Sequence, residues 1–525
     1  MNDMKRLIEE HITSATHLSK RHVHPRLMKM LEMGGMSAVF GRAEGPYLYD
    51  LEGHRYLDFL AGGGVFFIGR NHPAVRAALT DVLEMDLPNL CVVNASVLGG
   101  LLAEKLIELG GADQFSKVVY ANSGAEAIEV CIRFTRYMTR RRRFLFLEGA
   151  FHGRTYGAIS LCGFEQMKDG MDPKMPVCTP IRRNDLKGLR NELAKGDVAA
   201  FFFEPVQGMT AEVVDPGYLR EAETLCEKYG TVMVADEIQS GLGRTGAWFA
   251  SRELGLRPGM MTVSKTLAGG HVPVSAVLMS EAVYKGVYEK FKAGPIYFST
   301  FAENNLAMAA GIATLEVLKD LDAPARAKRL GDKLRVGIEK LAQKYDCIER
   351  VAGKGLFLAI YFKGSEKAKM RLQQELIAMA DKGGFAAAMN VDLFMRQKMI
   401  VQIPGPEVNA IKILPPVVSS EADVAYFLGA FEDSLAHFYG SGGPVVSLGT
   451  AVIKDAVRTV RKLLPGGDEP AAAPRGLGGA GGGAGAGGNG GNGGNGHALV
   501  AAEAAAPAPA STDQKKKFQV GETES

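Results

Sequence analysis

The feature that most restricts how this chain can fold is the run VAAFFF at residues 198–203, which is apolar at every position. A strand with one face in water alternates apolar and polar side chains, whereas a strand covered on both faces does not. Similar apolar runs lie within 143–150, 231–238, 260–265 and 274–280, and stretches with helical periodicity separate most of them. The sequence therefore predicts an α/β fold whose mostly parallel sheet carries helices on both faces.

Two further segments fit this scheme. Residues 46–60 predict two short strands around a turn at Asp50–Gly53, and residues 117–138 predict a buried strand, a glycine-containing turn and a long amphipathic helix. Beyond residue 464 the chain is dominated by Gly, Ala, Pro and Asn and has almost no apolar area to bury. Because such a segment cannot offset the entropy cost of ordering it, residues 465–525 are expected to form a disordered tail.

Composition argues against several classes of function. The 525 residues include 61 basic and 58 acidic side chains, and the basic cluster Arg140–Arg143 has no interleaved aromatic residues, so we expect no nucleic-acid partner. We expect no membrane segment, because no apolar stretch approaches the roughly 20 residues that span a bilayer. The N-terminus has no apolar leader, and the six cysteines show neither CxxC pairing nor metal-ligand spacing. The sequence predicts a cytoplasmic protein with reduced cysteines and no metal ion.

Ligands of parallel sheets bind beyond the carboxyl ends of the strands, so the residues that end each apolar run are the candidates for function. Asp236 directly follows the run TVMVA, and Lys265 stands where MMTVS gives way to a loop that contains Gly269 and Gly270. A surface lysine needs no such setting, but a lysine held beside a bound aldehyde does. Taken alone, Asp236 could equally be a helix N-cap or a member of a structural ion pair.

Two more strand ends carry groups suited to an aromatic phosphate. Ser123 begins a helix, where the unpaired backbone N–H groups of Gly124 and Ala125 and the helix dipole attract an anion. Phe151 and His152 place two rings directly after the apolar run in 143–150. Each signal is weak alone, because many helices begin with a capping serine and paired rings more often pack together than bind a cofactor.

Together, an anion site, an aromatic platform, a carboxylate and a lysine fit pyridoxal 5′-phosphate. In this interpretation Lys265 forms a Schiff base with the cofactor and, once an amine displaces it, acts as the base of the reaction. Asp236 keeps the ring nitrogen protonated, which lets the ring accept electrons. We expect burial and nearby positive charge to lower the pKa of Lys265 enough for its free amine to exist near neutral pH.

At this point the chain resembles the class III aminotransferases, fold type I pyridoxal-phosphate enzymes of the ornithine, acetylornithine, putrescine and GABA group. The resemblance covers about residues 20–440. It rests on the blocks NSGAEA, AFHGRT, EPVQG, DEIQSGLGRTG, SKTLAGG and STFAENNLAMAA, which begin at residues 122, 150, 204, 236, 264 and 299. The resemblance implies transfer of an amino group between a primary amine or ω-amino compound and a 2-oxo acid or aldehyde.

The resemblance also implies the domain organisation. It places a large cofactor-binding domain with a seven-stranded sheet at residues 61–304, and a smaller α/β domain at both chain ends, residues 1–60 and 305–464. Members of the family share active sites between subunits. We therefore expect a homodimer or a higher homo-oligomer in which Thr300 reaches the cofactor phosphate of the neighbouring subunit.

Within these blocks the resemblance assigns individual roles. Lys265 and Asp236 are the catalytic pair, Gln239 hydrogen-bonds the 3′-oxygen of the cofactor, and Glu204 lies near the cofactor and helps to orient Gln239. The remaining contacts to the phosphate and the ring are expected from Ser123, Gly124, Ala125, Phe151 and His152.

Three departures from the family pattern concern the substrate. Met209 replaces the second glutamate of the block EPIQGEGG, and Lys412 replaces the arginine that pairs with that glutamate in relatives. Lysine keeps the charge but lacks the bidentate fork of arginine. Gly63 replaces a polar aromatic residue and precedes Phe66, so this loop either merely repacks or makes the pocket roomier and more apolar. Arg154 remains as a clamp for a substrate carboxylate.

These departures predict the substrate preference. With Met209 in place of a carboxylate, Lys412 is expected to present a fixed positive charge to the pocket. We therefore expect donors whose far end is neutral, apolar or anionic, and the dual recognition of an ω-amine and 2-oxoglutarate is in doubt.

Two alternatives to the aminotransferase stay open at the level of sequence. Aminomutases and racemases of the same fold use the same lysine without net exchange and carry the same cofactor blocks. A non-catalytic binding protein would be credible if Lys265 or Asp236 had been lost, and both are present.

Overall fold

The structure, a computed structural model, describes residues 3–89, 95–170, 175, 177–289, 296–378, 383–405 and 408–440. The predicted tail at 465–525 and the end of the predicted small domain, 441–464, lie outside the described residues. The domain boundaries therefore stay a prediction. Within the described part of the chain, none of the helices combines the length and the apolar character that crossing a membrane requires.

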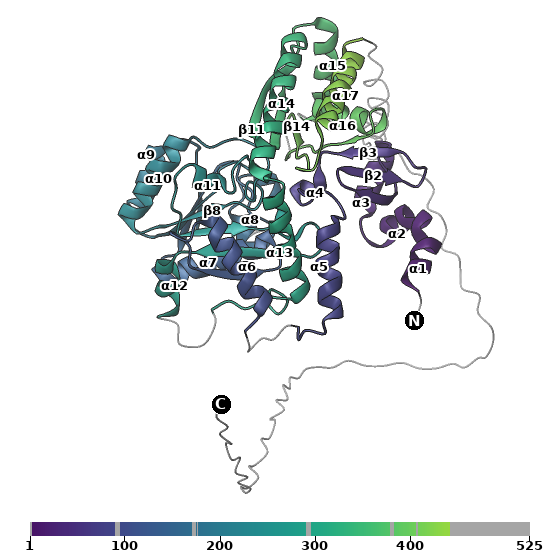
Figure 1. The fold of residues 1–525 in the computed structure, drawn as a ribbon. Coiled ribbons are helices and arrows are strands. Elements are labelled where there is room, and N and C mark those ends of the chain that lie inside the picture. Colours follow the sequence, from purple (N-terminus) through teal and green to yellow (C-terminus); the bar gives the residue numbers. More distant parts are fainter. Residues whose placement is uncertain are drawn as a thin grey trace, which may run out of the picture. The chain divides into compact units, whose positions relative to one another are not determined.

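A seven-stranded sheet lies at the centre of the fold, in the order β4-β10-β9-β8-β7-β5-β6 (Figure 1). Strand β10 pairs antiparallel with both β4 and β9, and the other neighbouring strands of this sheet pair in parallel, so the predicted mostly parallel sheet is confirmed. The strands are β4 (Lys117–Ala121), β5 (Arg143–Leu147), β6 (Cys178–Ile181), β7 (Val198–Phe203), β8 (Val232–Asp236), β9 (Met260–Val263) and β10 (Ser275–Met279).

The apolar run that opened the sequence analysis forms β7, which is buried along its whole length. Phe201 and Phe203 belong to one hydrophobic cluster and Phe202 to another, because successive side chains of a strand point to opposite faces. Residues of α7 share the cluster of Phe202 and residues of α10 share the other cluster. The absence of alternation in the sequence thus reflects helices on both faces of the sheet.

Most helices of the central part follow a strand and pack against the sheet. They are α5 (Pro73–Glu84), α6 (Val97–Gly110), α7 (Gly124–Thr139), α8 (Tyr156–Ser160), α9 (Leu186–Leu193), α10 (Pro216–Tyr229), α11 (Ala250–Glu253), α12 (Glu281–Tyr288) and α13 (Asn305–Asp320). Short 3₁₀ turns add η2 (Glu165–Met167) and η3 (Lys265–Ala268).

The two ends of the described chain meet in a second sheet of order β1-β2-β3-β13. Its strands are β1 (Phe40–Glu44), β2 (Tyr47–Asp50), β3 (Arg55–Asp58) and β13 (Met399–Ile400), and β13 pairs in parallel with β3. The hairpin predicted at 46–60 is confirmed by β2 and β3. Before this sheet lie α1 (Met4–His11), η1 (Ile12–Ser14), α2 (Ala15–His22) and α3 (Pro25–Met33), and α4 (Ala61–Gly64) follows β3.

A third sheet, of order β11-β12-β14, belongs to the C-terminal part. It comprises β11 (Ile348–Lys354), β12 (Phe357–Phe362) and β14 (Ala410–Ile413), and the accompanying helices are α14 (Ala323–Lys344), α15 (Ala368–Ala378), α16 (Gly384–Met395) and α17 (Glu421–Gly440). Figure 1 shows these elements grouped together and set apart from the central sheet. The expected smaller α/β portion built from both chain ends is thus present.

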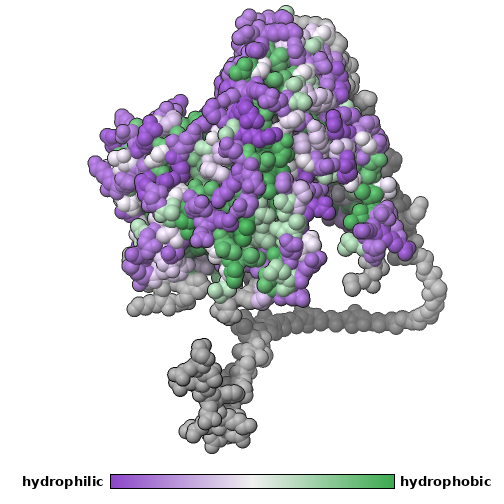
Figure 2. Space-filling view, in the orientation of Figure 1, coloured by the Kyte–Doolittle hydropathy of each residue, from purple (hydrophilic) through white to green (hydrophobic). Residues whose placement is uncertain are grey.

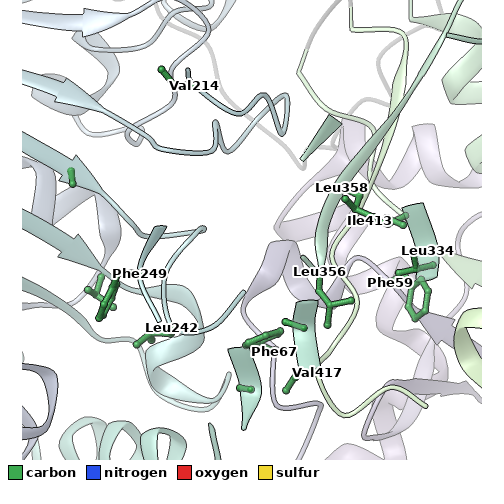
Figure 3. Close-up of a cluster of buried hydrophobic side chains, with 14 of the residues drawn as sticks. Phe59, Phe67, Val214, Leu242, Phe249, Leu334, Leu356, Leu358, Ile413 and Val417 are labelled. Carbon is green, nitrogen blue, oxygen red and sulfur yellow. The ribbon is translucent and has the colours of Figure 1, made fainter. Parts of the chain in front are cut away.

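One hydrophobic cluster continues from the central sheet into the third sheet (Figure 3). Figure 3 shows Phe67 beside Leu356 and Val417, and the backbone N–H of Val417 donates to the carbonyl of Phe67 at 2.6 Å. Leu242, on the segment after β8, belongs to the same cluster. The loop before α5 therefore lies between the two sheets, and its position is set by packing with both.

We predict that Gly331→Ala destabilises the protein by about 1–3 kcal/mol, the usual cost of overpacking. A Cβ atom at Gly331 in α14 would lie 2.1 Å from the carbonyl oxygen of Gly355, which is backbone and cannot rotate away. Gly429→Ala in α17 is the matched control, because its Cβ meets nothing within 4 Å and alanine favours a helix by up to about 1 kcal/mol. Denaturant unfolding measures both variants, and an unchanged midpoint for Gly331→Ala would contradict the prediction.

Candidate active site

Three ionisable residues stand at the carboxyl ends of neighbouring parallel strands. Glu204 follows β7, Asp236 ends β8, and Lys265 follows β9. Since parallel strands bring their carboxyl ends to the same edge of a sheet, these groups are brought together where ligands of such sheets bind. Both carboxylates act electrostatically on Lys265, as expected for a common site.

Lys265 begins η3 with a backbone φ of +41°, a left-handed conformation that costs a residue other than glycine on the order of 1–3 kcal/mol. Its Nζ forms no hydrogen bond or ion pair with any other described residue. Burial lowers the pKa of Lys265 to about 8, while Asp236 and Glu204 oppose this shift and Arg244 adds to it. The expected lowering is confirmed, and the free amine of Lys265 is a minor but accessible form near neutral pH.

Asp236 is 4% exposed, and its carboxylate has three partners. Oδ1 accepts hydrogen bonds from the backbone N–H of Ile238 at 3.0 Å and from the hydroxyl of Thr262 at 3.1 Å, and Oδ2 lies 2.7 Å from Nδ1 of His152. Burial is the largest single effect on the pKa of His152 and lowers it, but the hydrogen bond to Asp236 and the charges of Asp236 and Glu204 together outweigh burial and raise the pKa of the ring. Through its effect on His152, Asp236 therefore favours a positively charged ring in the site.

Glu204 lies beside this pair and is also buried. Its Oε2 accepts from the backbone N–H of Phe151 at 3.0 Å and its Oε1 from that of Gly208 at 2.6 Å. Burial raises the pKa of Glu204 to about 7, against the opposing charge of His152. Glu204 thus joins the loop after β5 to its own loop after β7.

The predicted anion site lies at the start of α7. Ser123 is the N-cap residue, and its Oγ accepts from the backbone N–H of Glu126 at 3.2 Å. Ser123 therefore caps the helix, as many serines in this position do. The first two N–H groups of the helix, those of Gly124 and Ala125, have no intrahelical partner. A Cβ at Gly124 would lie 2.8 Å from Cδ1 of Ile238, so only glycine fits at this approach.

Gln239 contacts the loop of Gly63, and its role toward the 3′-oxygen of the cofactor stays a prediction. Its Nε2 donates to the carbonyl of Gly63 at 2.8 Å. Among the described residues, no hydrogen bond joins Glu204 to Gln239. The two backbone N–H groups described above satisfy Glu204 instead. Gly63 itself has a φ of +73°, and a Cβ there would meet nothing within 4 Å, so this position borders open space.

Phe66 packs between two glycine-containing loops. A Cβ at Gly62 would lie 2.8 Å from its ring, and a Cβ at Gly270, in the loop after Lys265, would lie 2.2 Å from it. The guanidinium of Arg70 lies 4.0 Å from the centre of the ring. Phe66 thus fixes the loop of Gly63 against the loop of Lys265.

The two substituted positions, Met209 and Lys412, lie close together. Lys412 is 2% exposed, and its Nζ donates to the carbonyl of Gly208, the residue that precedes Met209. The methyl group of Met209 and the ring of Phe164 both approach Gly405. Burial, followed by the charge of Lys265, lowers the pKa of Lys412 to about 7. Near neutral pH only a fraction of Lys412 is therefore charged, so the charge at this position titrates and is not fixed as expected from the sequence.

Two other predicted residues are exposed. Arg154 lies 5.9 Å from the ring of Phe151, near enough to the site for the proposed carboxylate clamp. Thr300 follows Ser299, whose hydroxyl accepts from the side chain of Asn122 at 2.7 Å. Thr300 is thus near the anion site of its own chain, and its role toward a neighbouring subunit stays a prediction.

Sequence reasoning missed two residues of the site. Thr262 lies opposite Asp236 in the register of β8 and β9, and a threonine inside the apolar run MMTV was the signal. Arg244 is fully buried, and its side chain donates to the carbonyls of Gly64 at 3.0 Å and Pro415 at 2.8 Å. Its glycine-rich surroundings, GLGRTG, predicted a loop and gave no sign of burial.

Residues 31–435 match the protein family described as aminotransferase class-III. An acetylornithine aminotransferase from Mycobacterium leprae is 32% identical over 404 residues, which cover 76% of this chain and 91% of that protein. The aminotransferase PigE from a Serratia species is 28% identical over 446 residues, 78% of this chain. That match spans 52% of PigE, so the chain covers about half the length of this relative.

The fold has a close counterpart among solved structures. An ornithine aminotransferase from Toxoplasma gondii, crystallised with partial occupancy of pyridoxal phosphate at its active site, superimposes with a TM-score of 0.65 and 27% sequence identity. The superposition covers 77% of this chain and 91% of that chain. The expected fold type is confirmed.

We predict that Lys265 in cofactor-free protein reacts with an acylating reagent at half its limiting rate near pH 8, since that is its pKa. Exposed lysines, with an ordinary pKa of about 10.4, require a much higher pH. Asp236→Asn should lower the midpoint further, because the Asp236 charge raises the pKa of Lys265. Asp392→Asn, which removes another buried carboxylate, is the control and should leave the midpoint unchanged. Peptide mass spectrometry across a pH series gives the midpoints, and a midpoint above 10 would refute the assignment.

Proposed function

The chain belongs to the class III aminotransferases, which use pyridoxal 5′-phosphate, and on that premise we propose that Lys265 carries the transfer of an amino group from a primary amine or ω-amino compound to a 2-oxo acid or aldehyde. The observation that carries the proposal is the state of Lys265. Its pKa is lowered to about 8, so the uncharged amine is accessible just above neutral pH; it has no hydrogen-bonding partner among the described residues, and the charges of Asp236 and Glu204 act on it. Such an amine is both a nucleophile and a base.

The residues at the edge of the sheet fit the cofactor. The unpaired N–H groups of Gly124 and Ala125 suit its phosphate, and the partly buried ring of Phe151 suits its face. Asp236 is the carboxylate for the ring nitrogen, and Gln239 has a second Nε2 hydrogen left for the 3′-oxygen. Nε2 of His152 is buried without a partner among the described residues, as expected of a site that a ligand completes.

When bound, pyridoxal phosphate supplies a carbonyl carbon for the amino group and an electron-withdrawing ring. The protein supplies the proton transfers. Nζ of Lys265 takes the proton from the carbon of the amine substrate that bears nitrogen. When the oxo acid is converted, Nζ gives a proton to the corresponding carbon. Because the lysine begins η3 in a strained backbone conformation, its amine is aimed by the fold rather than by hydrogen bonds.

Asp236 and His152 control the charge at the far end of the site. The hydrogen bond with Asp236 raises the pKa of His152, so the ring places positive charge beside the carboxylate that we propose for the ring nitrogen of the cofactor. The hydroxyl of Thr262 and the N–H of Ile238 fix the direction of the carboxylate. Asp236 is therefore preorganised, and no rearrangement is needed during the reaction.

The substrate side combines apolar surface with positive charge. Met209 and Phe164 offer apolar groups, Gly63 borders open space, and Arg154 is exposed near the ring of Phe151. A distal ammonium group would lose hydration there without gaining a carboxylate partner. We therefore favour a donor with a neutral, apolar or anionic far end and an oxo-acid acceptor held by Arg154 and Lys412.

We also infer that two copies of the chain associate. Apolar side chains gather on the surface over α6 and α13 in Figure 2. Val97 and Leu101 of α6 are 75% and 44% exposed, and Phe298 and Phe301, before α13, are 53% and 61% exposed. Exposed apolar residues of this size favour burial against another chain. Because Phe298 and Phe301 flank Thr300, these exposed residues support a homo-oligomer with shared active sites.

A cytoplasmic location also stays a prediction.

We predict that Lys265→Ala lowers kcat for amine and oxo acid by at least about 10³-fold, since the base and the covalent anchor are lost together. Lys340→Ala, at an exposed position of α14, is the control and should keep wild-type turnover. Borohydride reduction followed by peptide mapping should find the cofactor attached at residue 265 in the wild type alone. Full turnover in Lys265→Ala, or attachment at another lysine, would contradict the proposed role.

We predict that putrescine is a poorer donor than butylamine at pH 7, with a ratio of kcat/KM below about 0.2. Placing the second ammonium beside Met209 and Phe164 costs at least about 1 kcal/mol, which is a five-fold effect. Initial rates with one oxo-acid acceptor give the ratio. A ratio well above one would show that the far end of the pocket is hydrophilic.

A further inference from the structure

The backbone of Lys412 is paired with a segment on each of its two edges, which fixes its position. In β14 it lies opposite Ala359 of β12, and it exchanges two backbone hydrogen bonds with Gln402, at 2.7 and 3.0 Å. The side chain therefore leaves a rigid element, and its Nζ reaches the carbonyl of Gly208 in the loop after β7. Residues 208 and 412 are 204 positions apart in sequence, so this contact links the third sheet to the edge of the central sheet.

The groups around Lys412 leave its charge only partly compensated. Lys265 and Arg244 disfavour the ammonium, Glu204 favours it, and the ring of Phe357 lies 5.7 Å from Nζ. No carboxylate lies within ion-pair distance of Nζ among the described residues. A buried ammonium without a carboxylate is costly, so the neutral amine becomes accessible. The lowered pKa, about 7, agrees with this geometry.

The backbone of Gly208 bonds to both Glu204 and Lys412. Its N–H donates to Glu204, and its carbonyl, which belongs to the next peptide group, accepts from Lys412. The next residue is Met209, whose methyl group is directed to Gly405. Lys412 therefore contacts the loop after β7, which also carries the apolar side chain of Met209.

Resting on the proposed function, we propose that Lys412 is a specificity-determining residue that works by proton exchange: it binds the carboxylate of the oxo-acid acceptor as an ammonium group and tolerates the amine donor as a neutral amine. The proton moves between Nζ and bulk water. An arriving carboxylate favours the ammonium and an arriving ammonium group favours the neutral amine, because like charges disfavour and opposite charges favour the charged form. One side chain thereby serves two substrates of opposite charge.

The test is the binding of glutarate, a dicarboxylate that has no oxo group, to the holoenzyme by titration calorimetry between pH 6 and pH 8.5. Because only the ammonium form binds the carboxylate, the dissociation constant should rise by about 20- to 30-fold across this range for a group that titrates near pH 7. Lys412→Arg should bind with little dependence on pH, since arginine stays charged. Lys412→Met should bind weakly at every pH, and Lys340→Met, at an exposed position, should behave as the wild type.

Glu204 also titrates near pH 7, and the variants separate its effect from that of Lys412. If Lys412→Arg kept the pH dependence of the wild type, Glu204 would be its source and the proposal would be overturned. If Lys412→Arg does not fold, the difference between the wild type and Lys412→Met decides: it should be large at pH 6 and vanish at pH 8.5. A constant difference overturns the proposal.

A second readout uses the donors. The ratio of kcat/KM for putrescine to that for butylamine should rise about ten-fold from pH 6 to pH 8.5 in the wild type and stay constant in Lys412→Met, because only the wild type loses a positive charge at residue 412. A constant ratio in the wild type refutes proton exchange. Failure of the proposed function is distinguishable from this result, because no oxo acid would then support turnover and glutarate would not bind at any pH.

Discussion

The hydrogen bond between His152 and Asp236 is the interaction on which the rest of the site depends. It joins the loop after β5 to the end of β8, two strands that have β7 between them. A carboxylate that is 4% exposed would be strongly destabilising without partners, and His152 supplies both a hydrogen bond and a positive charge. The charge of Asp236 in turn opposes the loss of the proton from Lys265. The pKa of the lysine is thus a balance between burial, which favours the neutral amine, and the charge of a carboxylate that is itself hydrogen-bonded to a histidine.

Three long cations lie near one another at this edge, and they differ in the number of hydrogen bonds that compensate their burial. Arg244 donates to three backbone carbonyls and lies 4.0 Å from the ring of Phe67, and burial lowers its pKa to about 9. Lys412 donates to one carbonyl, and Lys265 has no hydrogen-bonding partner among the described residues. A cation with several hydrogen bonds is held in place, whereas an amine without such bonds is free to act as a nucleophile. The structure thereby uses similar residue types as a clamp, a titrating group and a nucleophile.

The fold and the residues at the strand ends could be predicted from the sequence because their signals are local. The unbroken apolar run of β7 reports the helices on both faces, and Asp236 and Lys265 stand out because each ends such a run. The compensation of charge could not be predicted, since it depends on backbone carbonyls from distant segments. Arg244 is bonded to residues 64, 356 and 415, and the orientation of Gln239 is set by Gly63. No local pattern encodes which carbonyl a buried side chain will meet or how deeply it will be buried, so the sequence could not show that burial lowers the pKa of Lys412.

The effect of the residue at position 209 on the charge of the site depends on the residue at position 412. A glutamate at position 209 would place a carboxylate one residue from the carbonyl that Lys412 contacts, and it would hold the lysine in its charged form. With Met209, the carboxylate that acts on Lys412 is Glu204, which is already engaged by two backbone N–H groups. An arginine at position 412 could not respond to this loss, because its guanidinium stays protonated and would remain as a buried charge without a carboxylate. Lysine can respond by releasing a proton. Methionine at one position and lysine at the other therefore form one unit, in which the exchange of a proton with water replaces the movement of a carboxylate.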